Sequence, residues 1–192
     1  ALLTLYPDAK FVHIVRDGRG VAASVLPLDW GPNTIRTAAW WWMGELAHAF
    51  AGEGFAGPER ARRVRYEDLL RAPETELAAL CRFAGLDYAS EAAEGGRFRV
   101  PGYEKFHPLV GRPPDPRRAD AWREKLTPRQ IALFEDVAGD LLDLLGYSPV
   151  CRASDRSRRT LAARIADALI GELRARLNAR RAAKRFRTPH EG

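Results

Sequence analysis

A basic side chain and a hydroxyl with a spacing suited to phosphate binding stand near the start of the chain. Arg16 ends the apolar run 11–15, and Ser24 follows it beyond a glycine-containing turn. In open α/β sheets, ligands bind beyond the carboxyl ends of the strands, where helix N-termini attract anions. The pair therefore predicts a phosphate site. The alternative is a solvated arginine and a serine bonded to its own helix.

Two short strand-forming runs must position these groups. The run 11–15 is mostly apolar and β-branched, which predicts a strand buried on both faces of a parallel sheet. The run 61–66 alternates and ends at Tyr66, whose ring either contributes to a site or caps a loop through its hydroxyl. Because a helical crossover joins the two runs, we expect the strands to be parallel.

Helical periodicity accounts for much of the rest. Three consecutive tryptophans at 40–42 cannot share one stripe, since neighbouring helix residues project about 100° apart. We expect a wide core face there, with one ring turned elsewhere. The predicted helices and their end signals are 33–52 with Asn33 as N-cap, 73–84 ended by Gly85, and 127–145 opened by a capping box and ended by Gly146.

The segment 95–116 has little periodicity, and so long an irregular stretch is typical of a binding loop or lid. Arg117 and Arg118 follow it and precede Trp122. Within the segment, His107 precedes a proline and is predicted to be structural or exposed. The segment is therefore a candidate binding loop or lid.

The basic charge is concentrated at the C-terminal end. The chain of 192 residues has a net charge of +6, but the residues from Arg152 onward contribute twelve basic and four acidic side chains. The remaining 151 residues are therefore close to neutral, which disfavours a nucleic-acid-binding body. Apolar residues recur at every fourth position in the tail, which predicts a helix over residues 156–185. This helix could dock on the body of the protein, pair with a partner helix, lie on an anionic surface or stay solvated.

Other features of the composition set the expected environment. Cys81 and Cys151 form neither a metal-ligand spacing nor a disulfide framework, so a cytoplasmic location is expected. No apolar run approaches the length that spans a bilayer. The opening residues 1–7 read as the end of a helix already begun, and this predicts that the sequence is a fragment.

Several motifs occur in an order that resembles the sulfotransferases that use 3′-phosphoadenosine 5′-phosphosulfate (PAPS). These are RDGRGVAAS from Arg16 to Ser24, the tryptophan-rich helix, YEDL from Tyr66, and the phrases HPLVGRPPDPRRADAWREKLTP and DLLDLLGYSP. The first phrase is closest to the tyrosylprotein and bacterial branches. The resemblance spans residues 6–147, and its ordered elements make it more specific than any single motif.

The resemblance implies a P-loop nucleotide-kinase-like α/β fold, in which helices flank a parallel sheet. In this chain the fold is expected to be incomplete at the N-terminus and to be followed by a C-terminal helical tail. We expect residues 1–150 to form the C-terminal part of a sulfotransferase domain and 151–192 to form the tail. The implied cofactor-binding residues, which contact the 3′-phosphate or the adenine, are Arg16, Ser24, Tyr66, Arg117 and Arg118.

The implied reaction moves a sulfuryl group from PAPS to a hydroxyl or amine, leaving 3′-phosphoadenosine 5′-phosphate (PAP), without a metal. The acceptor is a small molecule, a carbohydrate or a protein; no nucleic acid is expected, and a homo-oligomer is compatible with the sequence. The family's loop for the 5′-phosphosulfate and its catalytic base have no counterpart here. No catalytic residue is therefore assigned, and the isolated chain is expected to be inactive and poorly stable.

Two other functions remain open from the sequence. One is a phosphate-transfer enzyme of the same architecture, such as a kinase using ATP, although no G-x-x-x-x-G-K-[ST] sequence occurs. The other is a non-enzymatic module that binds a nucleic acid or an anionic surface through the basic tail. Binding of the latter kind should weaken steeply with salt.

Overall fold

The computed structural model describes residues 2–95, 109–151 and 160–185. Along the chain it divides into two compact units, one formed by residues 1–16 and 48–120 and the other by 17–47 and 121–192. The elements in chain order are α1 (Leu2–Leu5), β1 (Phe11–Val15), α2 (Gly18–Val25), α3 (Ile35–Ala56), β2 (Ala61–Arg65), α4 (Tyr66–Arg71), α5 (Pro73–Ala84), the short 3₁₀ helices η1 (Ser90–Ala92) and η2 (Pro116–Ala119), α6 (Trp122–Lys125), α7 (Pro128–Leu144) and α9 (Thr160–Arg185).

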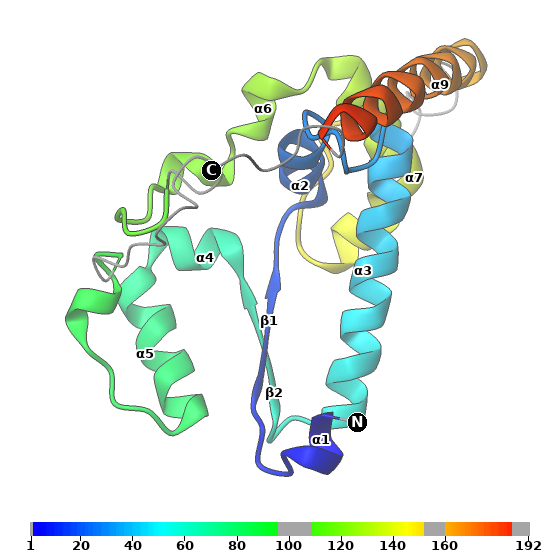
Figure 1. Cartoon of the computed structure of the whole chain (residues 1–192). Coiled ribbons are helices and arrows are strands. Elements are labelled where there is room, and N and C mark those ends of the chain that lie inside the picture. Colours follow the sequence, from blue (N-terminus) through cyan, green and yellow to red (C-terminus); the bar gives the residue numbers. More distant parts are fainter. Residues whose placement is uncertain (1, 96–108, 152–159, 186–192) are drawn as a thin grey trace, which may run out of the picture. The chain divides into compact units, whose positions relative to one another are not determined.

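The first unit is built on a parallel pair of strands. β1 and β2 lie side by side in register, with Phe11 opposite Ala61 and Val15 opposite Arg65 (Figure 1). β2 passes directly into α4, and α4 contacts both α5 and η2. The two strands and their parallel orientation are therefore as predicted, and their carboxyl ends meet at one edge of the sheet.

The prediction that 11–15 is buried on both faces is wrong. Val15 is buried, but Val12 and Ile14 are 44% and 55% exposed. Side chains alternate between the two faces of a strand, and the described residues do not cover the face that carries Val12 and Ile14. An apolar, β-branched run identifies a strand without showing that both of its faces are covered within this chain.

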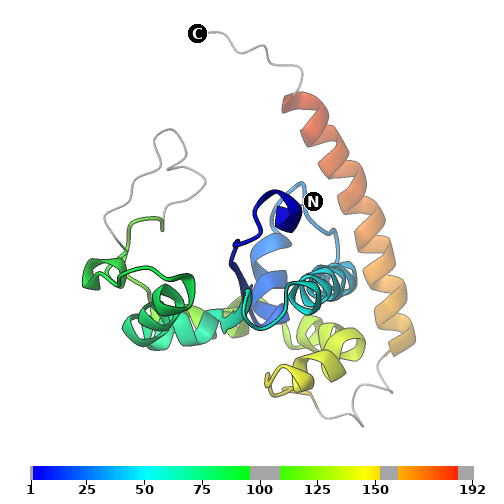
Figure 2. The ribbon, with the colours of Figure 1, turned by 90° about the horizontal axis from the view of Figure 1, so that it is seen from below.

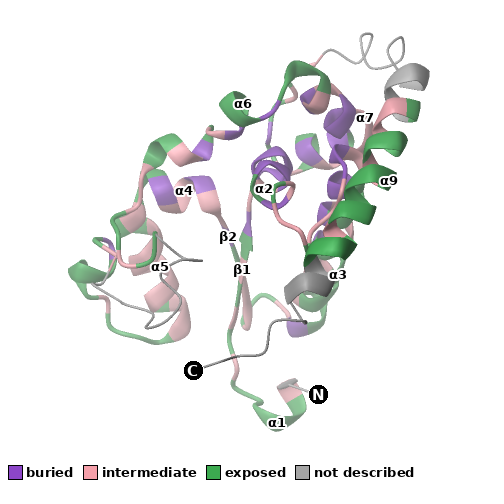
Figure 3. Cartoon of the chain, turned by 45° about the horizontal axis from the view of Figure 1, so that its top comes forward, coloured by how far each residue is buried: buried purple, intermediate pink, exposed green. Residues whose placement is uncertain are grey.

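In the second unit, helices enclose an aromatic core. α2 contacts α6 and α7, and its buried residues face inward along most of its length (Figure 3). Trp42 and Phe134 lie with ring centroids 5.8 Å apart, and Trp122 is 2% exposed. Gly18 fits between Trp42 and Phe134, because a Cβ atom at this position would lie 2.6 Å from each.

Three helix predictions need correction. The N-terminal cap of α3 is Thr34, whose hydroxyl accepts from the Thr37 N–H at 3.2 Å, and not Asn33; α3 also continues to Ala56. The expected wide core face is absent, since Trp42 is buried but Trp40 and Trp41 are 60% and 39% exposed.

The end signals of the other helices are confirmed. Gly85 ends α5 with a φ of 75°, a left-handed conformation that glycine adopts without strain. Thr127 and Gln130 form the capping box of α7, with each side chain accepting a hydrogen bond from the other residue's N–H. The described part of the tail, residues 160–185, is one long helix, α9 (Figure 2).

Candidate functional site

The Arg16 guanidinium lies over the ring of Tyr66, with Cζ 4.5 Å from the ring centroid. The reason is the parallel register: Val15 pairs with Arg65, so the residues that follow them leave adjacent strands at the same edge. A cation above an aromatic face is electrostatically favourable. The structure thus brings together two of the residues that the sequence predicts for a nucleotide site.

Arg117 and Arg118 lie in the same unit, on η2, which contacts α4. Asp115 holds Arg117 through three hydrogen bonds at 3.0–3.1 Å, from the backbone N–H and from two nitrogens of the guanidinium. These bonds lower the pKa of Asp115 and raise that of Arg117. The Arg117 side chain is 91% exposed and available to an anion.

Ser24 lies on α2 in the second unit. Its hydroxyl donates to the carbonyl oxygen of Gly20 at 2.9 Å, one helical turn earlier. This is the backbone bond that the sequence left open as an alternative to ligand binding. The residue is exposed, so the hydroxyl can be reached from solvent.

A buried charge cluster lies next to the predicted site residue in the sequence. Arg19, 2% exposed, donates to both carboxylate oxygens of Asp17 at 3.0 and 2.7 Å and to Glu135 at 2.6 Å. Its Cζ also lies 4.2 Å from the ring centroid of Trp122. Burial alone would lower the pKa of Arg19, but the hydrogen bonds and charges of Asp17 and Glu135 outweigh it and raise the pKa.

Glu135 extends this cluster to the segment that follows α7. Its Oε1 accepts from the Val150 N–H at 2.9 Å, and its Oε2 accepts from the Cys151 N–H at 2.8 Å. Arg19 also donates to the Ser148 carbonyl at 3.1 Å. Sequence reasoning missed this cluster. The only local signal was the close spacing of Asp17 and Arg19 at a helix start, where Asp17 accepts from the Arg19 N–H at 2.9 Å.

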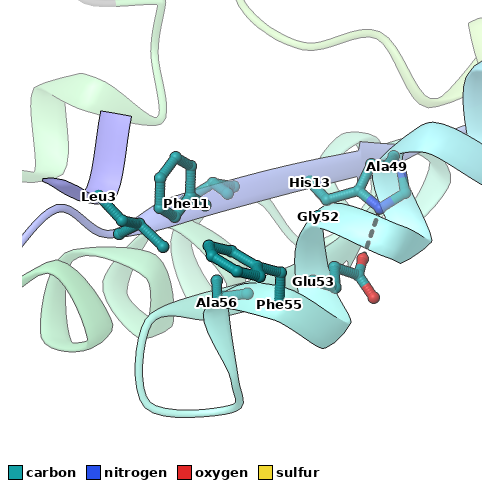
Figure 4. A pocket seen from close by; sticks show the side chains of 10 residues that line it. Leu3, Phe11, His13, Ala49, Gly52, Glu53, Phe55 and Ala56 are labelled. Atoms are coloured by element: carbon teal, nitrogen blue, oxygen red, sulfur yellow. Dashed lines mark hydrogen bonds and ion pairs between the residues drawn. The ribbon is translucent and has the colours of Figure 1, made fainter. Parts of the chain in front are cut away.

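A second group of polar residues borders an apolar cavity of about 430 Å³ in the first unit (Figure 4). His13 Nδ1 lies 2.5 Å from Glu53 Oε1, and Arg63 donates to the same carboxylate. Leu3, Phe11 and Ala61 also line the cavity, which places it toward the amino ends of both strands. Arg16 leaves β1 at the opposite end, so this cavity is separate from the predicted phosphate site.

Some predictions concern residues that the structure does not describe. His107 and most of the predicted lid lie outside the described residues. In the described ranges, no three histidine, cysteine, aspartate or glutamate side chains gather as a metal site would require. No helix among those residues is long and apolar enough to cross a bilayer.

Comparison with known proteins gives one consistent result. Residues 1–90 match the model of the family described as "Sulfotransferase family". Carbohydrate sulfotransferase 4 of Mus musculus is 30% identical over 106 residues, which cover 51% of this chain and 26% of that protein. Carbohydrate sulfotransferase 7 of Mus musculus is 35% identical over 106 residues, covering 53% and 21%, respectively.

Two solved structures share the fold. The sulfotransferase domain from the Synechococcus PCC 7002 olefin synthase is 28% identical with a TM-score of 0.52, covering 68% of this chain and 49% of that one. The sulfotransferase domain from the curacin biosynthetic pathway is 19% identical with a TM-score of 0.51, covering 72% and 55%. The chain spans about a quarter of the curated relatives and about half of each solved domain.

These matches agree with the predicted resemblance and fold: the chain is similar to members of the sulfotransferase family and shares the α/β architecture of the solved domains. The mammalian relatives named here are carbohydrate sulfotransferases, whereas the motif in the sequence suggested the tyrosylprotein and bacterial branches. The family match covers β1, β2 and α4, and therefore includes Arg16 and Tyr66.

Proposed function

We propose that this chain supplies the 3′-phosphate and adenine side of a PAPS-binding site in a sulfotransferase. The observation that carries the proposal is the placement of Arg16 over Tyr66 at the carboxyl ends of adjacent parallel strands. This edge is where open α/β sheets bind ligands. A forked cation beside an aromatic ring provides both contacts that a phosphorylated nucleoside needs, one for the phosphate and one for the base.

In this proposal the guanidinium of Arg16 binds the 3′-phosphate, and the Tyr66 ring contacts the adenine. The Ser24 hydroxyl reaches the same phosphate by leaving its bond to Gly20, while Arg117 and Arg118 supply further positive charge. The bound PAPS supplies the sulfuryl group, which an acceptor hydroxyl or amine receives. Contacts to the 3′-phosphate are distant from the reacting sulfur, so their binding energy can be used to orient it.

For the acceptor, the names of the curated relatives favour a carbohydrate hydroxyl over another small molecule or a protein. A cytoplasmic location remains part of the proposal. The competing function is a kinase of related architecture, which would bind ATP in preference to PAP.

Calorimetry with PAP on the full-length protein tests the nucleotide site. Losing a charge-assisted hydrogen bond costs about 1.5–3 kcal/mol, so Arg16→Ala should weaken PAP binding by about ten- to a hundredfold and Ser24→Ala by less. Arg82→Ala is the matched control, because it removes an exposed arginine of α5 from the same unit. Equal affinity in wild type and Arg16→Ala would overturn the assignment, and displacement of PAP by ATP at similar concentrations would favour the kinase.

A further inference from the structure

The helix α9 contacts the rest of its unit through polar and small residues. Asn178 donates to the Asn33 side chain at 2.9 Å, and Arg174 donates to the Asn33 carbonyl at 3.3 Å. About one turn before Arg174 on the same face, Gly171 lies so close to Thr34 that a Cβ atom would be 2.6 Å from the threonine methyl. The docked face of α9 is therefore its polar face.

Much of α9 is exposed to solvent, and its exposed residues include large apolar ones (Figure 3). With 3.6 residues per turn, its large apolar residues occupy a sector about 140° wide, which we call the leucine face. Four of its members, Ile165, Leu169, Leu173 and Leu177, are 51–63% exposed. The fifth, Ile170, is 48% exposed and lies at the edge of the face, where it borders a cavity with Thr34 and Leu133. A surface helix normally turns such a stripe toward the core of its own domain. This helix does the reverse, which leaves the leucine face to contact another partner.

The charges on α9 indicate what that partner is. The segment 160–185 has seven basic and two acidic residues, a balance of +5. Arg176 and Arg180 are exposed and project within the same sector, at the end of the leucine face that Leu173 and Leu177 form, and Arg176 is paired with Glu172 at 3.0 Å. A long helix that combines an exposed apolar face with arginines at one end of it is similar to the helices that lie in the plane of an anionic membrane surface.

Pairing with a second copy of α9 fits these observations less well. Leu169, Leu173 and Leu177 are spaced by four residues, so the stripe rotates by about 40° per step, whereas a coiled-coil seam needs an average spacing of about 3.5 residues. Two helices of +5 would also repel each other at contact. A flat surface accepts a wide, rotating face, and anionic headgroups neutralise its arginines.

We propose that α9 is a membrane-surface helix, which binds anionic lipid headgroups through its arginines and inserts the leucine face into the boundary between headgroups and acyl chains. The long arginine side chains can keep their charge at the headgroups while their methylene groups lie against the apolar layer. This function does not depend on the nucleotide site.

Cosedimentation of the full chain with lipid vesicles tests this proposal. We expect binding to vesicles of equal parts phosphatidylcholine and phosphatidylglycerol, and little binding to phosphatidylcholine alone. The double variant Leu169→Asn/Leu173→Asn should bind at least about tenfold more weakly. Arg176→Gln/Arg180→Gln should also weaken binding and reduce its salt dependence.

The matched control is Ala168→Asn/Ala175→Asn, which places the same two polar side chains on α9 away from the leucine face. Circular dichroism on all variants checks that the helix content is retained. Vesicle binding that is equal in the leucine variant and the alanine control would overturn the proposal. It would also fail if neutral vesicles bound as well as anionic ones, or if sedimentation showed a stable dimer that requires Leu169 and Leu173 and does not bind vesicles.

Discussion

Arg19 and Glu135 form a buried ion pair between positions 116 residues apart, with 2.6 Å between Nη1 and Oε1. Asp17 binds the other side of the same guanidinium, and Asp17 follows Arg16 directly in the chain. The cluster therefore holds Asp17 at the start of α2. It also joins the start of α2 to α7.

We expect Arg19→Met to destabilise the protein strongly. Removing one partner of a buried ion pair leaves an uncompensated charge and costs about 3–5 kcal/mol. Here the carboxylates of both Asp17 and Glu135 would remain buried. Urea unfolding measures the change. The control is Arg176→Met, whose pair with Glu172 is exposed at both ends and should contribute under about 1 kcal/mol; similar losses in the two variants would contradict the role given to the cluster.

Gly18→Ala should destabilise the protein by about 1–3 kcal/mol, as expected for an overpacked core. The added methyl group would meet Phe134 and Trp42 at 2.6 Å, and both side chains are buried, with exposures of 0% and 4%. Gly44→Ala is the control, because a Cβ atom there has no neighbour within 4 Å and α3 would gain helix propensity. Thermal unfolding should place the two melting temperatures on opposite sides of wild type. A Gly18 variant as stable as wild type would show that the rings have room to move.

Thr127→Ala should weaken the start of α7. The substitution removes the hydroxyl that accepts from the Gln130 N–H at 3.2 Å, and loss of such a cap costs about 0.5–2 kcal/mol. Thr127→Ser keeps the hydroxyl and should lose little. Chemical denaturation of both variants measures the difference, and equal stability of the serine and alanine variants would argue against the cap.

The free energy of unfolding should decrease at acidic pH, partly because the Glu53 carboxylate becomes protonated. Its hydrogen bond from Arg63 lowers its pKa, and the contact with His13 acts in the same direction. A carboxylate with a lowered folded-state pKa stabilises the protein above its unfolded pKa, and this contribution is lost as the pH falls through the folded pKa. The Glu53→Gln variant should therefore have a lower free energy of unfolding than wild type near about pH 7. The difference in unfolding free energy between the two proteins should become smaller toward about pH 3. A gap independent of pH would show that the charge of Glu53 is not the cause.

Structural features that depend on residues close together in the sequence were predictable. The strands and the end signals of α5 and α7 follow from local patterns, and the parallel pairing follows from the helical crossover. The resemblance to the sulfotransferases placed Arg16 and Tyr66 in one site, and the structure brings them into contact. The Arg19 cluster was not predictable, because Glu135 has no signal that relates it to a distant arginine. Asn33 failed as a cap because Thr34 caps the helix, while the Asn33 side chain accepts from Asn178 instead. The roles of Arg16, Ser24, Tyr66, Arg117 and Arg118 in nucleotide binding remain predictions.

The division into two units has a spectroscopic consequence. The five tryptophans, at positions 30, 40, 41, 42 and 122, all fall in the unit formed by 17–47 and 121–192. Indole emission therefore reports on that unit alone, with Trp42 and Trp122 shielded from a soluble quencher and Trp30 and Trp40 open to it. Far-ultraviolet circular dichroism records helices in both units. Coincident denaturation curves from the two signals would mean that the units unfold cooperatively, whereas separated curves would resolve an intermediate in which one of them is still folded.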